Sequence, residues 1–100
     1  MNKPCPLYGA VFGVSIESVE FLLKSGANVD YQDIWHERKT ALHLASQIGN
    51  LDIVKLLTDY VANENVLDAN ELTPLQTAEK FGSNEVANYL AKVFLSHFGS

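Results

Sequence analysis

Residues 40–57 read TALHLASQIGNLDIVKLL, and the pattern of this stretch recurs on both sides of it. Downstream, five chemically matched positions return 33 residues later and pair Thr40, Leu42, Ala45, Gly49 and Asp52 with Thr73, Leu75, Ala78, Gly82 and Glu85. A fixed period of this size is the signature of stacked supersecondary units. We therefore interpret the chain as copies of one unit.

The upstream copy is offset by 35 residues instead of 33. It pairs Leu7, Ala10, Glu17, Val19, Leu22, Ala27 and Asp33 with Leu42, Ala45, Asp52, Val54, Leu57, Ala62 and Asp68. Two extra residues therefore lie between Gly26 and Thr40, so the connection between the first two units is predicted to be longer than the connection between the second and the third.

These sequence segments resemble the ankyrin repeat. Residues 40–45 (TALHLA), followed by Gly49 and residues 52–57 (DIVKLL), carry the resemblance, with residues 73–75 (TPL) and 24–30 (KSGANVD) as further opening and closing phrases. The match covers about residues 5–92. It implies an all-α repeat solenoid of helix-turn-helix pairs joined by β-hairpin loops, with repeats at about 5–33, 38–68 and 71–100 of a single domain, residues 1–100.

Composition agrees with a small folded domain of this kind. Nearly half of the 100 residues are apolar, which argues against disorder. The net charge of −5 argues against a nucleic-acid binder and favours a basic protein partner. The single cysteine, Cys5, cannot form an internal disulfide, which fits an intracellular protein of the cytoplasm or nucleus. The apolar run at residues 7–14 is shorter than the roughly 20 residues of a membrane-spanning helix, so no membrane partner is expected.

Helix signals divide each unit into an inner and an outer helix. Pro6 fits the first turn of an inner helix at about residues 7–12, and Ser15 is the expected N-cap of the next helix. Gly26 is expected to end that helix in the left-handed conformation. Val61 replaces the capping glycine after the outer helix at about residues 51–60, so we expect that turn to be strained or differently shaped.

The search for catalytic or metal-binding motifs favours a protein without enzymatic activity. His36 and Glu37 begin like a zinc-protease motif, but position 40 is threonine, so the second ligand is missing. His36, His43, His97 and Cys5 show no metal-ligand spacing. No nucleophile-elbow, phosphate-loop or dinucleotide motif occurs, so no cofactor or metal is expected. The resemblance instead assigns His43 a structural role, in which it bonds backbone groups of a neighbouring unit.

The resemblance also implies a binding surface for another protein, formed by the tips of the hairpin fingers and a concave groove along the inner helices. Carried onto this sequence, it predicts a non-catalytic interaction module that binds an extended peptide or a helix. The predicted contact residues are Phe12, Trp35, His36, Glu37, Lys39, Gln47, Ile48, Asn70, Leu72, Lys80 and Phe81.

Several members of this set have two interpretations. Trp35, on the longer finger, is either an interface anchor or a side chain folded back onto the core. Phe12 is either exposed or tucked under a hairpin, whereas Ile48 and Phe81 are expected to be exposed. Glu37, Lys39 and Lys80 are expected at the charged rim of the groove.

The C-terminal residues support an alternative function. Val93, Phe94, Leu95 and Phe98 form an apolar tail that either folds back as a cap or packs on something outside this chain. The second case would make the chain a structural or inhibitory segment of a larger assembly, such as a longer array or a regulatory domain packed on an enzyme. A self-sufficient module is expected to be a monomer.

One further expectation concerns covalent modification. The resemblance marks Asn65, eight residues after Leu57, as a candidate for hydroxylation, although asparagine in such turns more often hydrogen-bonds the loop.

Overall fold

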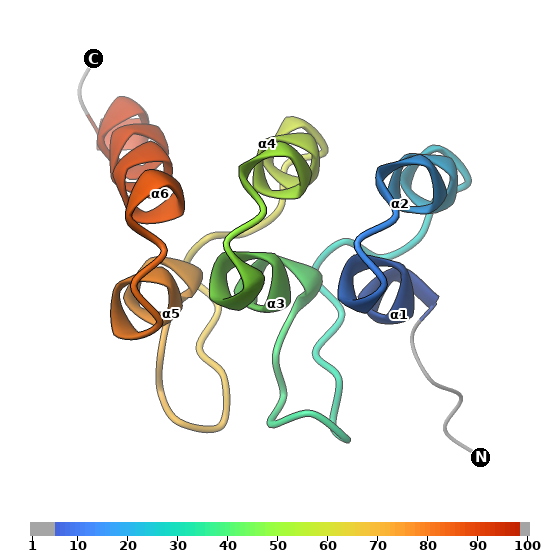
Figure 1. Cartoon of the computed structure of the whole chain (residues 1–100), viewed down its shortest axis with the longest axis horizontal. Coiled ribbons are helices and arrows are strands. Elements are labelled where there is room, and N and C mark those ends of the chain that lie inside the picture. Colours follow the sequence, from blue (N-terminus) through green and yellow to red (C-terminus); the bar gives the residue numbers. More distant parts are fainter. Residues whose placement is uncertain (1–5, 99–100) are drawn as a thin grey trace.

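The computed structural model describes residues 6–98 and, within them, three consecutive helix pairs (Figure 1). The first helices of the pairs are α1 (Pro6–Phe12), α3 (Ala41–Ile48) and α5 (Pro74–Lys80). The second helices are α2 (Ile16–Lys24), α4 (Leu51–Asp59) and α6 (Asn84–Phe98). The three first helices form one row and the three second helices form another, which confirms the predicted helical repeat fold (Figure 1).

Local sequence sets where the helices begin. Thr40 and Thr73 are N-caps whose hydroxyl oxygens accept from the backbone N–H three residues later. The side chains of His43 and Gln76 in turn accept a hydrogen bond from the backbone N–H of the capping threonine, which completes a capping box at both helices. Ser15 caps α2 as expected.

Two turns after second helices need the left-handed conformation. Gly26 has φ of 90° after α2, and Val61 at the corresponding position after α4 has φ of 63°. A β-branched residue is rarely found there because its side chain crowds the backbone. The expected strain at Val61 is therefore present.

The core runs between the two rows of helices. It is built from side chains that recur at the repeat period, among them Leu7, Leu42, Val19, Val54 and Leu57. Helix α3 packs against α1 and α5 in its own row and against α4 in the other, so the central repeat is covered on both sides. The stability of each repeat therefore depends on its neighbours.

The connections between repeats project beyond the first row of helices on the same side (Figure 1). We call them the first finger, residues 25–40, and the second finger, residues 60–73. Residues 6–98 contain no extended strand in these loops, and one isolated antiparallel bridge between Asp33 and Lys39 closes the first finger. Their geometry depends instead on Asp33 and Asp68, whose buried carboxylates accept backbone N–H bonds from Trp35 in the first finger and from Asn70 and Leu72 in the second.

The two fingers differ by two residues, as the repeat offset predicts. The backbone N–H of Asp33 donates to the carbonyl of Lys39, whereas that of Asp68 donates to Leu72, four positions later instead of six. Non-glycine residues occupy the left-handed region in both loops: Arg38 at 58° and Glu71 at 61°.

Candidate protein-binding site

The candidate site is the finger side of the stack, which we define as the C-terminal ends of α1, α3 and α5 together with the two fingers. Its large apolar side chains reach solvent. The exposed fraction is 72% for Phe12, 66% for Trp35, 42% for Ile48 and 49% for Phe81. The open alternatives for Phe12 and Trp35 are thereby decided in favour of exposure.

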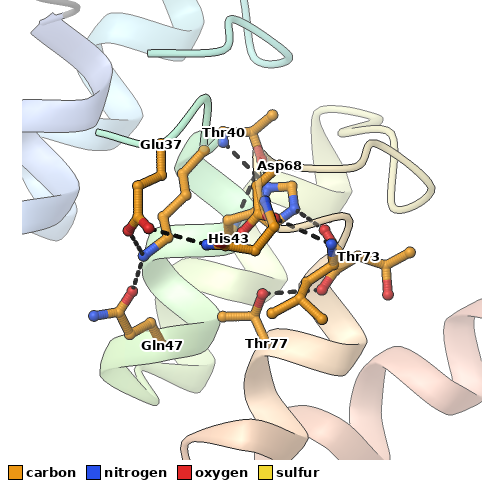
Figure 2. A network of polar contacts seen from close by, with 10 residues as sticks. Glu37, Thr40, His43, Gln47, Asp68, Thr73 and Thr77 are labelled. Carbon is orange, nitrogen blue, oxygen red and sulfur yellow. Dashed lines mark hydrogen bonds and ion pairs between the residues drawn. The ribbon is translucent and has the colours of Figure 1, made fainter. Parts of the chain in front are cut away.

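Lys39 draws several of the predicted residues together. Its ammonium lies 2.7 Å from Gln47 Oε1 on α3 and 3.3 Å from Glu37 Oε1 on the first finger (Figure 2). The same nitrogen stands 6.0 Å from the ring centroid of Phe81 at the end of α5. The first finger, α3 and α5 therefore meet at one cation.

The expected rim role of Lys39 is wrong. Only 11% of its side chain is exposed, because the carboxylate of Glu37 and the amide of Gln47 hold the ammonium against the surface. Lys80 remains exposed, with its ammonium 6.0 Å from the Phe81 ring centroid. Of the two expected rim lysines, Lys80 is the one available to a partner.

Glu37 also joins the two fingers. Its carboxylate accepts from the Asn70 amide at 3.0 Å, and its backbone carbonyl accepts from the Ala69 N–H at 2.8 Å. The hydrogen bond from Asn70, followed by the bond and charge of Lys39, lowers the pKa of Glu37 below its usual value. Gln32 adds a further link, donating to the carbonyl of Leu67 in the second finger. The fingers are thus held at a fixed separation before any partner arrives.

His36 and Leu72 belong more to the framework than was predicted. The His36 ring stacks on Tyr8 of α1 at 4.7 Å between centroids, and its Nδ1 lies 3.2 Å from Asp33 Oδ2. Burial, and then the nearby Asp33 and Glu37 carboxylates, raise the pKa of Tyr8 to about 12. Leu72 is half-buried at the base of the second finger, where its carbonyl accepts from His43.

His43 is the link between the second and third repeats. Nδ1 accepts from the Thr40 N–H at 3.1 Å, so Nε2 carries the proton and donates to the Leu72 carbonyl at 2.8 Å (Figure 2). The side chain is fully buried, and burial holds the pKa of His43 below its usual value. Its expected structural role is confirmed by these bonds.

The apolar tail extends the last helix. Residues 93–98 continue α6, with Phe94 partly exposed and Leu95 mostly exposed. The side chain of Phe98 lies outside the described residues. Asn65 is exposed in the loop after α4, and its backbone N–H donates to the Asn63 side chain.

A second feature of the surface was not predicted from the sequence. Glu64, Asn65, Leu75 and Phe94 belong to the lining of a pocket of about 330 Å³ beside α5 and α6. Its sequence signal is the replacement of Val29 of the first repeat by Glu64 at the corresponding position of the second.

Comparisons with known proteins agree with this geometry. The profile of the family described as ankyrin repeats matches residues 6–96 as three copies. The chain belongs to the ankyrin-repeat family. Ankyrin repeats generally act as protein-interaction modules and form a non-catalytic fold.

The similar proteins are segments of much larger chains. The transient receptor potential cation channel subfamily A member 1 of Drosophila melanogaster is 39% identical over 90 residues, which cover 85% of this chain and 7% of the channel. Mouse inversin is 39% identical over 87 residues, covering 87% of this chain and 8% of inversin. The E3 ubiquitin-protein ligase KEG of Arabidopsis thaliana is 35% identical over 74 residues, or 74% and 4% of the two chains.

The ankyrin chain therefore spans less than a tenth of the length of these three relatives. In the described part of the chain, residues 6–98, no helix is long and apolar enough to cross a membrane. Within the same residues, no group of three or more His, Cys, Asp or Glu side chains could hold a metal ion.

Proposed function

We propose that this ankyrin domain is a non-catalytic intracellular module that binds another protein through its finger side. The observation that carries the proposal is the exposure of Ile48 and Phe81 next to the contacts of Lys39, where the first finger, α3 and α5 meet. Large apolar side chains surrounded by polar groups are typical of interface centres. Trp35 and Phe12 extend the apolar surface to the first finger and α1.

The framework around these side chains favours a preorganised surface. Glu37 bonds both Lys39 and Asn70, so the finger separation does not have to be established during binding. A surface that is already ordered loses less conformational entropy when the partner docks. The partner we propose is an extended peptide or a helix whose apolar side chains cover Ile48 and Phe81.

Alanine at Ile48 or Phe81 is expected to weaken partner binding by about tenfold or more while stability hardly changes. The affinity falls because each side chain is an anchor. Stability is retained within about 1 kcal/mol because each side chain is already about half exposed. Peptides selected by phage display on the wild-type chain provide the ligand, with affinity measured by calorimetry and melting by circular dichroism.

Phe21→Ala provides a matched control for these variants. Phe21 is a similarly exposed aromatic residue, but it lies on α2 in the other row of helices. It should leave the affinity unchanged. If Phe21→Ala lost as much affinity as Phe81→Ala, the result would contradict binding at the finger side.

The alternative function is that of a structural or inhibitory segment within a larger assembly. It is favoured by the small share of the relatives' length that this chain covers and by the exposure of Phe94 and Leu95. If the chain is a self-sufficient module, light scattering will show a monomer from micromolar to millimolar concentration. A concentration-dependent dimer that Leu95→Lys abolishes would favour the assembly surface instead.

A further inference from the structure

Two hydrogen-bond donors from different fingers meet at the carboxylate of Glu37. The ammonium of Lys39 lies 3.3 Å from one carboxylate oxygen, and the side-chain amide of Asn70 donates to the other oxygen at 3.0 Å. An ammonium and an amide are groups with which proteins bind carboxylates. The chain therefore fills a carboxylate site on the finger side with a residue of its own.

Glu37 compensates a positive charge that lies beside the proposed apolar anchors. The ammonium of Lys39 is 2.7 Å from Gln47 Oε1 and 6.0 Å from the ring centroid of Phe81, and neither group carries a negative charge (Figure 2). The ammonium of Lys80 is also 6.0 Å from that centroid. Without the Glu37 carboxylate, the charge of Lys39 would add to that of Lys80, and the surface beside Phe81 would attract acidic peptides.

The repeat period shows that the charge and its countercharge occur together. Asn70 and Leu72 of the second finger stand 33 positions after Glu37 and Lys39, and both are uncharged. Glu37 also has φ of 59°, a left-handed conformation that glycine adopts at lower cost. An acidic residue thus stands at a position where the backbone alone would favour glycine. Strain of this kind is typical of functional sites.

We propose that Glu37 sets the charge specificity of the finger side: its carboxylate occupies the donors of Lys39 and Asn70 and excludes partners that would place an acidic side chain there. A partner carboxylate would have to displace a group held in the same chain, and the displaced Glu37 would stay close enough to repel it. The hydrogen bond from Asn70, followed by the bond and charge of Lys39, keeps the pKa of Glu37 low, so the side chain is ionised at neutral pH. Excluding a wrong partner contributes to specificity as contacts to the right partner do.

This inference rests on the proposed function, because it concerns the partner of the same surface. It specifies that the peptide residue that faces Lys39 and Asn70 is uncharged or basic, while apolar residues cover Ile48 and Phe81. Removing the Glu37 carboxylate should therefore widen the range of partners. Removing the anchors Ile48 and Phe81 has the opposite effect, because it weakens binding.

One test needs no partner. The full chain is treated with a limiting amount of an acetylating reagent, and the modification of each lysine is followed by mass spectrometry of proteolytic fragments. Lys39 should react more slowly than the exposed Lys80. Glu37→Gln should raise the rate at Lys39 severalfold, whereas Glu85→Gln, which removes an exposed carboxylate on α6, should leave it unchanged. An unchanged rate at Lys39 in Glu37→Gln would overturn the proposal.

A second test uses a peptide selected by phage display on the wild-type chain, with an affinity that falls in Phe81→Ala. Its side chains are replaced one at a time by glutamate and by glutamine, and each pair is titrated by calorimetry. In Glu37→Gln, the preference for glutamate should rise about fivefold at one peptide position, relative to the wild type and to Glu85→Gln. Equal preferences in all three proteins, or an equal rise in both variants, would contradict exclusion by Glu37. If no selected peptide depends on Ile48 or Phe81, the proposed function fails, and the acetylation rates still decide whether Glu37 covers Lys39.

Discussion

Replacing His43 with alanine is expected to lower the free energy of unfolding by about 3 kcal/mol and the melting temperature by about 15 °C. The variant loses the bond from the Thr40 N–H and the bond to the Leu72 carbonyl at the same time. The Thr40 N–H then remains buried without a partner, and the Leu72 carbonyl keeps only the bond from the Asp68 N–H, beside the cavity that the imidazole leaves. Thermal and urea denaturation followed by circular dichroism measures the loss.

His43→Gln is the matched control for His43→Ala, because a glutamine already makes the same capping bond in the next repeat. Gln76 stands at the same position of α5 and accepts from the Thr73 N–H at 2.9 Å, as His43 does from Thr40. Glutamine at position 43 should keep the capping box and lose about 1 kcal/mol, mainly from the weakened link to Leu72. Equal losses in the alanine and glutamine variants would show that the capping bonds do not contribute as argued.

The same histidine is expected to make stability depend on pH. Burial lowers the pKa of His43 in the folded chain, with Lys39 acting in the same direction and the Leu72 carbonyl and Asp68 opposing it. The unfolded chain therefore takes up the proton first as the pH falls. The stabilisation by neutral His43 is complete above the ordinary pKa of 6.5 and is lost as the pH falls through the lowered folded value.

The difference in stability between wild type and His43→Gln isolates this contribution, because all other titrating groups are common to both proteins. That difference should be constant from pH 7 to 8 and should shrink as the pH is lowered below about 6.5. A difference that stays constant down to pH 5 would contradict a neutral buried His43.

Much of the fold could be predicted because the repeat carries its information locally. Ser15 marks a helix start by its own hydrogen-bonding chemistry, and Val61 marks a strained turn because glycine is absent there. The offset of 35 residues predicted a longer first finger, and the backbone bonds of Asp33 and Asp68 show it. Each of these signals lies within a few residues of its effect.

The candidate site was less predictable because its arrangement depends on contacts between repeats. Lys39 contacts Gln47 on α3 and lies near Phe81, a residue of the next repeat. The sequence of the loop does not show these contacts, so Lys39 was expected at the exposed rim. The stacking of His36 on Tyr8 likewise joins a finger to the preceding helix. Whether the exposed apolar residues bind a partner stays a prediction.

A second large effect is expected at Leu42, in the middle of the stack. Leu42→Ala should lower the free energy of unfolding by about 3–4 kcal/mol. The side chain is 1% exposed, and the helices packed against α3, which are α1, α4 and α5, cannot all move in to close the cavity. For a domain whose total stability is of the order of 5–15 kcal/mol, such a loss is a large fraction. Urea denaturation monitored by circular dichroism provides the measurement.

Leu75→Ala is the internal control, since Leu75 is the same residue one repeat later. Its side chain is only partly buried and lines the pocket instead of facing a further helix pair, so the loss should be about half as large. The ratio of the two losses measures how much of each repeat's stability comes from its neighbour. Equal losses at Leu42 and Leu75 would mean that burial within a single helix pair, and not stacking between pairs, holds this fold together.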